Sequence, residues 1–322
     1  MNKELEIWQF AARKLKRDEA LLLLVVAESS GSSPGRQGFK MIVARNEMRG
    51  SIGGGVMEVN LVQSAKCKVQ NNENKPELVE QVHRKNSEDA SGMICSGKQT
   101  VIFLELNSRH LKTVEKIIFT LIYNQTRKLQ ISNIGLRVLE NIENNSGFYF
   151  AETRENEFVY EELLGCKNKL FIIGGGHCAL ALSELMSGMD FHISLFDDRE
   201  DLNTLAKNEF VHEKHILDSY EKIADFIESG ADIYVVVMTL GFVFDEIVIR
   251  QLFKKNFKYF GVLGSKAKMK TLLRNLEKEG LCKERLKKIR APIGLKINSR
   301  TPEEIAVSIA AEIIAVKNAV LS

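Results

Sequence analysis

The sequence predicts an α/β protein of two domains, with a parallel sheet in the second domain. The chain has 322 residues, which corresponds to about two domains of ~100–200 residues each. Hydrophobic residues make up 44% and charged residues 27%, a composition typical of globular proteins and not of disordered chains. In the second half, short apolar strands alternate with helical segments, and this alternation indicates βαβ units on a parallel sheet.

Composition also narrows the function classes. The net charge of +3 is a small basic excess, whereas nucleic-acid binders usually concentrate basic residues on one face, so no nucleic-acid partner is expected. No apolar run reaches the ~18 residues of a membrane helix, and the charged amino terminus lacks the apolar core of a signal peptide. We therefore expect a cytoplasmic protein without a membrane span. The five cysteines are scattered and form no CxxC pair: Cys67, Cys95, Cys166, Cys178 and Cys282.

The elements of the first half follow from periodicity and turn residues. Apolar residues at helical spacing predict helices over 2–17, 56–69 and 111–122. Strands are expected over 21–27, 39–43, 99–106, 131–139 and 147–151. We assign residues 1–155 to this domain and the charged, weakly periodic residues 156–168 to a linker.

Residues 169–322 form the second expected domain. Strands are predicted over 170–173, 191–196, 232–238 and 259–263, with helices over 177–187, 218–229, 245–255 and 265–278. The final helix has the plainest signal, because Thr301-Pro302-Glu303-Glu304 combines a capping box with proline at the first helical position.

A glycine turn joins the first strand and helix of this second domain. Gly174, Gly176 and Ala179 fit the spacing G-x-G-x-x-A between a strand and a helix, and Asp197 and Asp198 end the next strand. In this context the second glycine allows a phosphate to approach the backbone, and the acid can accept from a ribose hydroxyl. The segment therefore predicts a Rossmann-like parallel-sheet domain, either with a nucleotide or with another ligand at the turn.

Two residues beside this turn have two interpretations each. His177 begins the helix, where its side chain either contacts a ligand or is structural. Arg199 follows the acid pair and either meets a 2′-phosphate or pairs with a neighbouring carboxylate.

Two further glycine segments, Gly31-Ser-Ser-Pro-Gly-Arg-Gln-Gly38 and Gly50-Ser-Ile-Gly-Gly-Gly55, lie in the first half. Such segments are often only tight turns, but glycines also let the backbone crowd a ligand, and a helix N-terminus favours anions. Two of them in one domain, with hydroxyls and an arginine, favour a phosphorylated or pterin-like ligand. The candidate binding residues are Gly31, Ser32, Ser33, Arg36, Gly53, Gly54, Gly55 and Glu58.

Cys95 lies between Gly92 and Gly97, ahead of an expected strand. A thiol in a loop can bind a soft metal or carry sulfur. The alternative is a buried or incidental thiol. Cys95 is the candidate metal ligand and the candidate catalytic contact of the chain.

The motifs together resemble the xanthine dehydrogenase accessory protein family, XdhC/CoxI, over nearly the whole length. The resemblance rests on their order and number: Gly31-Ser-Ser-Pro34, Gly38-Phe-Lys-Met41, Gly50-Ser-Ile-Gly-Gly-Gly55 with Glu58, Ile94-Cys95-Ser96-Gly97, Ile173-Gly-Gly-Gly-His177, Asp197-Asp-Arg199, Tyr259-Phe-Gly-Val-Leu-Gly264-Ser265, Ala291-Pro-Ile-Gly-Leu295 and Arg300-Thr-Pro-Glu-Glu-Ile-Ala306.

The resemblance implies a chaperone of the molybdenum cofactor. It would bind molybdopterin, alone or as a dinucleotide, and assist its sulfuration and insertion into a molybdenum hydroxylase such as xanthine dehydrogenase. It also implies a cysteine desulfurase-type sulfur donor, a homodimer, and an N-terminal α/β cofactor domain in an accessory factor rather than the dehydrogenase itself. Two alternatives remain: an NAD(P)-dependent oxidoreductase that uses the Rossmann domain, and a protein-interaction platform that binds neither ligand.

Overall fold

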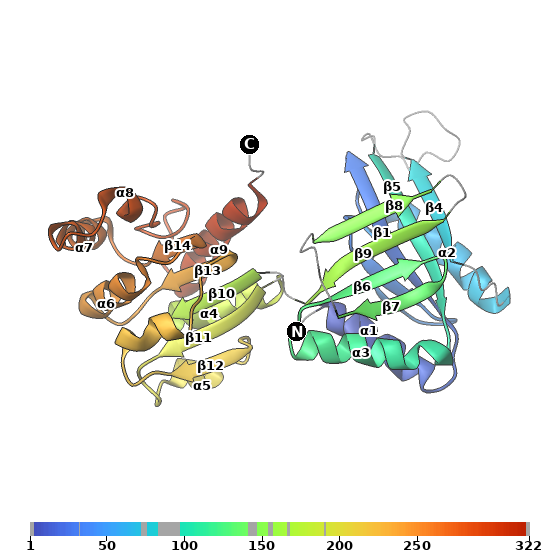
Figure 1. Ribbon diagram of the computed structural model, residues 1–322, viewed down its shortest axis with the longest axis horizontal. Helices are drawn as coiled ribbons and strands as arrows, with labels where there is room; N and C mark the ends of the chain where they lie inside the picture. The colour runs from blue at the N-terminus through green and yellow to red at the C-terminus, as the bar shows by residue number, and fades with distance from the viewer. Residues whose placement is uncertain are drawn as a thin grey trace. The chain divides into compact units, whose positions relative to one another are not determined.

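The computed structural model contains two compact units, an N-terminal unit over Asn2–Gly165 and a C-terminal unit from Cys166 to Ser322 (Figure 1). It describes residues 3–31, 33–71, 76–82, 97–140, 147–153, 157–165, 168–189 and 191–319. Both units mix helices and strands, and the sheet of the C-terminal unit is parallel, so the predicted fold class is confirmed. None of the helices in the described ranges has the length and apolar character needed to cross a membrane.

The N-terminal unit contains two antiparallel sheets, with strand orders β3-β2-β1-β5-β4 and β7-β6-β9-β8. Its elements in chain order are α1 (Lys3–Leu15), β1 (Leu21–Gly31), β2 (Lys40–Val43), β3 (Met48–Gly50), α2 (Gly55–Asn71), β4 (Glu77–Val82), β5 (Gly97–Leu106), the 3-10 turn η1 (Ser108–His110), α3 (Leu111–Ile122), β6 (Arg127–Ser132), β7 (Gly135–Leu139), β8 (Phe148–Glu152) and β9 (Phe158–Leu164).

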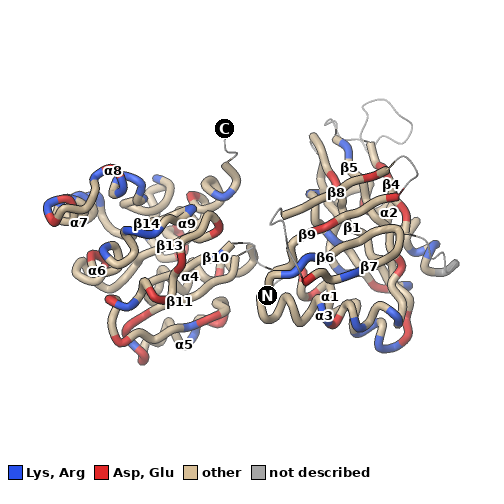
Figure 2. Tube along the Cα trace, in the orientation of Figure 1, with Lys and Arg blue, Asp and Glu red and all other residues tan. Residues whose placement is uncertain are grey.

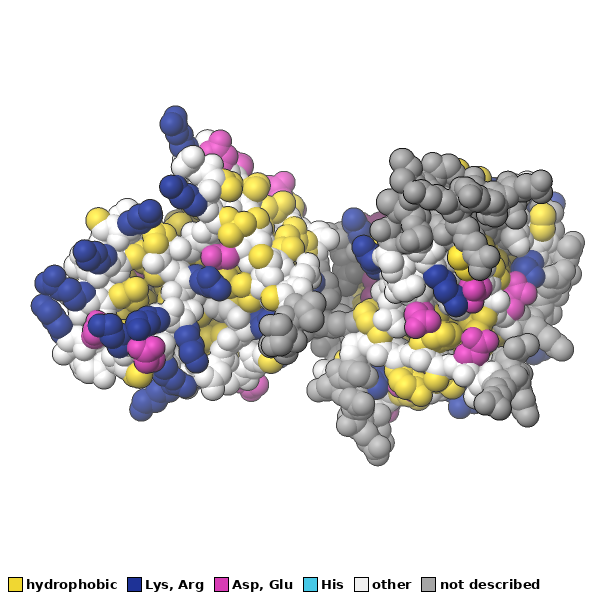
Figure 3. Space-filling view, turned by 90° about the horizontal axis from the view of Figure 1, so that it is seen from above, with side chains coloured by type: hydrophobic (Ala, Val, Ile, Leu, Met, Phe, Trp, Pro, Cys, Tyr) yellow, Lys and Arg dark blue, Asp and Glu magenta, His cyan; other side chains and the backbone are white. Residues whose placement is uncertain are grey.

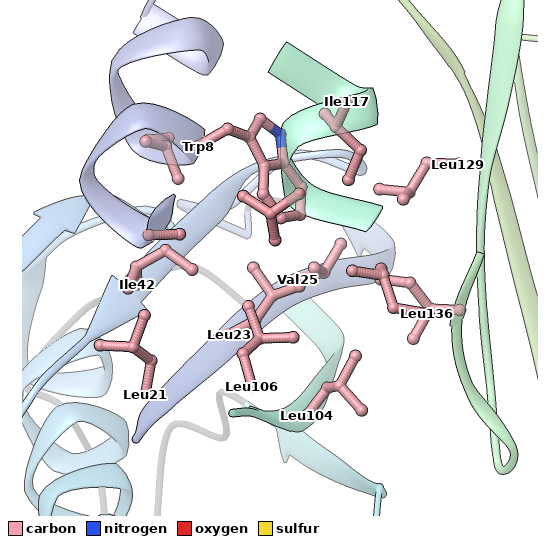
Figure 4. Packing of buried hydrophobic residues seen from close by; sticks show 14 of the residues in the cluster. Trp8, Leu21, Leu23, Val25, Ile42, Leu104, Leu106, Ile117, Leu129 and Leu136 are labelled. Carbon is pink, nitrogen blue, oxygen red and sulfur yellow. The ribbon is translucent and has the colours of Figure 1, made fainter. Parts of the chain in front are cut away.

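The continuous apolar run at the start of β1 is explained by cover on both of its faces. Leu21, Leu23 and Val25 belong to a core shared with α1, α3 and the second sheet. The alternate residues of the strand point the other way, into a core closed by α2. Trp8 of α1 is fully buried and lies near Ile117 of α3 in the first of these cores (Figure 4).

Strand β9 occupies most of the stretch that we expected to be a linker. The boundary between the two units lies after Gly165, and β9 pairs with both β6 and β8. The charged residues of β9 suggested a solvated linker, but Glu162 is buried. Its Oε1 lies 2.6 Å from Nζ of Lys40 in β2, and its Oε2 accepts a hydrogen bond from the Tyr160 hydroxyl at 2.7 Å. This ion pair joins the two sheets.

The parallel sheet of the C-terminal unit has the strand order β12-β11-β10-β13-β14. The chain moves outward from β10 in one direction and then in the other, which is the strand order of the Rossmann fold without its sixth strand. The elements are β10 (Asn168–Ile173), α4 (His177–Ser187), β11 (Phe191–Asp197), α5 (Asn203–Lys207), β12 (Glu213–Ile216), η2 (Tyr220–Asp225), β13 (Gly230–Val237), α6 (Phe242–Leu252), β14 (Phe257–Val262), α7 (Lys266–Lys278), α8 (Lys283–Leu286) and α9 (Pro302–Asn318).

Helices cover both faces of this sheet. One buried core contains residues of α4 and α9, and the other contains residues of α6, α7 and η2. The helix expected over 218–229 is a single 3-10 segment, η2, whose start is capped by the hydroxyl of Ser219. The carboxyl ends of β10 and β13 meet where the strand order reverses, and we call this place the switch point. Ligands of open α/β sheets bind at such a point.

Candidate functional site

The turn after β10 requires its first glycine. Gly174 has φ of +107°, a conformation that side chains rarely adopt, and its N–H donates to the carbonyl of Phe196 at 2.7 Å. A Cβ there would collide with the backbone oxygen of Met238, which follows β13. The turn therefore packs directly on the neighbouring strand at the switch point.

Gly175, the middle glycine of the turn, is held by side chains of the same unit. The Gly175 N–H donates to Oδ2 of Asp197 at 2.6 Å, and its carbonyl accepts from the Thr204 hydroxyl at 2.5 Å. Arg199 forms a fork with both carboxylate oxygens of Asp197 at 2.9 Å each. Of the two interpretations of Arg199, the structure therefore shows the pairing with a carboxylate.

The carboxylate of Asp197 is buried, and burial alone would raise its pKa. The hydrogen bonds from Arg199 and from the Gly175 N–H outweigh this effect and lower the pKa of Asp197 below its usual range. Both carboxylate oxygens thus have partners within the chain. Asp198 is partly exposed, and its Oδ1 accepts from the hydroxyl of Tyr220 at 3.2 Å.

The start of α4 presents amide groups without a carboxylate of its own. The N-cap residue Gly176 supplies no side-chain hydrogen bond, and the first turn of the helix contains no acid. A Cβ on Gly176 would meet no heavy atom within 4 Å, and His177 is exposed. The first N–H groups of a helix lack intrahelical acceptors, and with the helix dipole they favour an oxyanion.

On the other side of the switch point, three polar side chains form a cluster that was not among the predicted site residues. Asp245 is fully buried, and its carboxylate accepts from the Thr239 hydroxyl at 2.6 Å and from Nζ of Lys268 at 2.8 Å. These residues come from the end of β13, from α6 and from α7. No local motif joins them, so only the arrangement of the three elements brings them together.

The two glycine segments of the N-terminal unit contact one another. A Cβ on Gly53 would lie 2.6 Å from the backbone carbon of Pro34, and one on Gly35 would lie 2.6 Å from Oε1 of Gln99. The buried hydroxyl of Ser33 donates to the same Gln99 oxygen at 2.9 Å. Gln99 of β5 therefore holds the first segment in place, and its position in the polar start of the strand, Gly-Lys-Gln-Thr, gave no signal for this role.

Glu58 occupies the anion position at the start of α2. Its Oε2 accepts from the N–H groups of Ile52 and Gly54 at 2.8 and 2.9 Å and from the Ser51 hydroxyl at 2.7 Å. Partial burial would raise the pKa of Glu58, but these hydrogen bonds outweigh it and the pKa is lowered. An anionic ligand at this turn would have to displace the carboxylate.

The remaining predicted residues of this unit have fewer contacts. Gly31, Gly55 and Arg36 are exposed, and Gly31 pairs with Gly97 at the start of β5. Ser32 and Cys95 lie outside the described residues. Within the described ranges, no three histidine, cysteine or acidic side chains are arranged to hold a metal.

The fold and the switch point define the class of protein: a two-unit α/β protein whose C-terminal unit is a Rossmann-type domain with a turn suited to phosphate. The comparison with protein families is more specific. Residues 170–313 match the XdhC Rossmann domain, and residues 15–80 match the XdhC and CoxI family. The chain belongs to this family.

Individual relatives agree with this assignment. The chain is 25% identical over 240 residues to a Bacillus subtilis protein whose name describes it as a probable xanthine dehydrogenase subunit, covering 74% of this chain and 67% of that one. It is 23% identical over 315 residues to YqeB of Escherichia coli, covering 98% of this chain but 47% of the relative, so it spans about half of that protein. A crystal structure described as a xanthine dehydrogenase from Bacillus halodurans has the same fold, with a TM-score of 0.74, 24% identity, and coverage of 98% and 96% of the two chains.

Proposed function

We propose that this chain is an accessory protein in the maturation of xanthine dehydrogenase-type molybdenum hydroxylases. It binds the molybdenum cofactor while the cofactor is sulfurated, and it assists insertion into the client enzyme. Family membership supports the client class, and the name of the Bacillus subtilis relative is consistent with it.

The start of α4 carries the proposal for cofactor binding. Molybdopterin carries a phosphate, and the turn offers amide groups at a helix N-terminus, no acid in the first turn, and no atom where a side chain of Gly176 would lie. Backbone N–H groups and the helix dipole would hold the phosphate, and His177 at the exposed head of the helix would contact the remainder of the ligand. Arg36 is an exposed cation within the first glycine segment of the N-terminal unit.

The first experiment identifies the ligand. The protein is purified from cells that synthesise the molybdenum cofactor, oxidised, and analysed for a released fluorescent pterin. Gly176→Val should lose the pterin, because the branched side chain fills the space that a phosphate needs. Gly188→Val is the matched control, since Gly188 ends the same helix with equally open space around its Cβ position. Equal pterin content in both variants would contradict the proposal for this turn.

The second experiment addresses Cys95 as the contact to sulfur or molybdenum. Cys95→Ser should fold normally and fail to activate a co-expressed xanthine dehydrogenase. Cys67→Ser and Cys282→Ser are controls, because both thiols are free and exposed. A client fully activated by the Cys95→Ser protein would show that this thiol has no part in delivery. Co-purification with a cysteine desulfurase and light scattering test the expected sulfur donor and homodimer.

The strand order favours one further candidate function, that of an NAD(P)-dependent oxidoreductase. In that case Asp198 rather than Asp197 would accept from a ribose hydroxyl, because the oxygens of Asp197 already bind Arg199 and Gly175. A nicotinamide nucleotide in the extract, with no pterin, would favour the oxidoreductase.

A further inference from the structure

A second candidate binding site lies at the outer edge of β14. A pocket of about 280 Å³ is lined by residues of three segments: 253–260 around the start of β14, 285–290 in and after α8, and Val316 of α9. Arg290 pairs with Gly261 as a short continuation of the sheet, so the pocket is built on the sheet edge.

This pocket lies away from the switch point. Strands β13 and β14 are parallel, with Gly230 opposite Phe257 at their amino ends and Val237 opposite Val262 at their carboxyl ends. The glycine turn contacts Met238 just beyond the carboxyl end of β13, whereas the pocket begins where α6 ends and β14 starts. A ligand of the switch point therefore leaves this pocket free.

The lining is basic. It contains five cationic side chains and no acidic one: Lys255, Lys258, Arg285, Lys288 and Arg290. Figure 2 shows lysine and arginine gathered along α7, α8 and the neighbouring chain. In Figure 3 basic side chains spread among hydrophobic ones on this unit, with few acidic side chains between them.

These charges are not neutralised by acids in the part of the chain that the structure describes. The Lys255 ammonium donates to the carbonyls of Ala224 and Ile227, and Arg285 donates to the Phe253 carbonyl and the Asn256 side chain, all neutral acceptors. Lys258, Lys288 and Arg290 form no ion pair among the described residues. Several cations brought together in this way repel one another, and an anion relieves that repulsion.

The pocket also has an aromatic wall. Phe257 and Phe260 are partly buried and meet edge to face, with ring centroids 5.5 Å apart. Phe253 lies under the Arg285 guanidinium, 5.9 Å from it. Aromatic faces beside cations favour a flat ring that carries a negative group.

We propose that this pocket binds a nucleoside monophosphate, with the base against Phe257 and the phosphate among Lys258, Lys288 and Arg290. The volume of about 280 Å³ lies just below the range of about 300–1,000 Å³ that is usual for small-molecule sites. The ligand is therefore no larger than one base, sugar and phosphate, and a dinucleotide does not fit entirely. The nucleotide is bound either as a free molecule or as the terminal half of a dinucleotide.

The first test is calorimetric titration of the full chain with CMP, GMP, AMP and inorganic phosphate. Lys258→Ala combined with Arg290→Ala should raise the dissociation constant of the nucleotide about ten-fold or more, as expected when charge-assisted hydrogen bonds are lost. The control is Lys266→Ala combined with Lys270→Ala, which removes the same charge from the exposed face of α7. This pair should change the dissociation constant of the nucleotide less than about two-fold. Equal losses in the two pairs, or no nucleotide binding by the parent at millimolar concentration, would overturn the proposal.

A second pair of measurements separates the base from the phosphate. Phe257→Leu should weaken nucleotide binding about five-fold, since the stacking of the base on an aromatic ring is lost, and should leave phosphate binding unchanged. Inorganic phosphate that binds as tightly as the nucleotides would overturn the proposal. Gly176→Val should have no effect here, and loss of nucleotide binding in that variant would assign the binding to the switch point instead. Titration with a dinucleotide, alone and in competition with the monophosphate, separates the two sources of ligand.

Discussion

Each unit contains a glycine turn that leads into a helix, and the two turns differ in what their amide groups bind. In the N-terminal unit, Glu58 from the first turn of α2 accepts from the backbone of the glycine turn. In the C-terminal unit, α4 has no acid in its first turn, and the carboxylate of Asp197 reaches only the middle glycine. A run of glycines before a helix therefore does not by itself define an anion site. An acid in the first turn of the helix, such as Glu58, can bind these amide groups itself and leave no room for an anion from solution.

The largest effect should come from a side chain at the contact between the N-terminal glycine segments. Gly53 has φ of +130°, and a Cβ there would overlap Pro34 and Gly35. Gly53→Ala should lower the free energy of unfolding of this unit by about 3 kcal/mol, since strain and overpacking each cost about 1–3 kcal/mol. Gly54→Ala should cost about 1 kcal/mol, from its positive φ alone.

Denaturant unfolding followed by tryptophan fluorescence measures both variants. Trp8 is the single tryptophan of the chain and is buried in the N-terminal unit, so its signal reports on this unit. Similar costs for the two alanines would show that the contact between the glycine segments contributes little.

The next effect concerns how the C-terminal turn holds its own acid. Arg199→Ala leaves the buried carboxylate of Asp197 without its fork, and we expect the C-terminal unit to lose about 2 kcal/mol, below the 3–5 kcal/mol of a fully buried pair because Arg199 is partly exposed. Arg199→Lys keeps the charge but not the bidentate geometry, so the stability of the C-terminal unit in this variant should lie between those of the parent and of Arg199→Ala. Calorimetry measures the transition of this unit. An unchanged transition for Arg199→Ala would mean that the backbone N–H groups of Gly175 and residue 199 are enough to stabilise the carboxylate.

Removing Glu58 should make the glycine turn of the N-terminal unit resemble that of the C-terminal unit. Glu58→Ala leaves the N–H groups of Ile52 and Gly54 without acceptors, and we expect a loss of about 1.5 kcal/mol. Phosphate or sulfate should then raise the melting temperature of the N-terminal unit in the variant more than in the parent. If the anion raised the melting temperature equally in parent and variant, the turn would not form an anion site once the Glu58 carboxylate is removed.

The same carboxylate gives a pH dependence of known sign. The pKa of Glu58 is lowered in the folded state, so its stabilising contribution is complete above the unfolded-state pKa near 4.5 and is lost as the pH falls through the lower folded value. The difference in stability between parent and Glu58→Gln should therefore be constant near neutral pH and shrink below about pH 4.5. A stability difference that increased as the pH fell would show that the pKa of Glu58 is raised in the folded state, not lowered.

The smallest effect should be the reverse conversion. Gly176→Asp places a carboxylate at the N-cap of α4, where the backbone is extended and no neighbour interferes. It should stabilise the C-terminal unit by about 0.5 kcal/mol through capping and the helix dipole. It should also abolish binding of any phosphate at this turn, which Gly176→Ala should not do. Retained phosphate affinity in Gly176→Asp would place the ligand elsewhere.

Local signals predicted much of the fold. The strand, turn and helix around Gly174 are adjacent in sequence, and their apolar run, glycines and helical pattern agree with one another. The capping box at Thr301 is present with both reciprocal bonds. The α/β class and the longer elements of the second half followed from such segments, whereas the short elements α5, β12 and α8 were not predicted.

Contacts between distant residues could not be predicted. Strand β9 was missed because Glu162 is of a residue type common on surfaces, yet here it is buried and paired with Lys40 of another strand. The cluster of Thr239, Asp245 and Lys268 depends on three separate elements. Glu58 was predicted as a binding residue, but no pattern showed that its carboxylate turns back onto the glycine turn.

The ion pair of Lys40 and Glu162 has a consequence for synthesis on the ribosome. Lys40 has a partly exposed counter-charge from the start, Glu4 of α1 at 2.9 Å, but its fully buried one, Glu162, arrives only with β9, the last strand of the N-terminal unit. Burying a charge without its buried partner is costly, so we expect the second sheet to close over Lys40 only after β9 has been translated. The first strand of the C-terminal unit, β10, follows within a few residues. Release of one finished unit and the start of the next are therefore closely spaced in time on this chain.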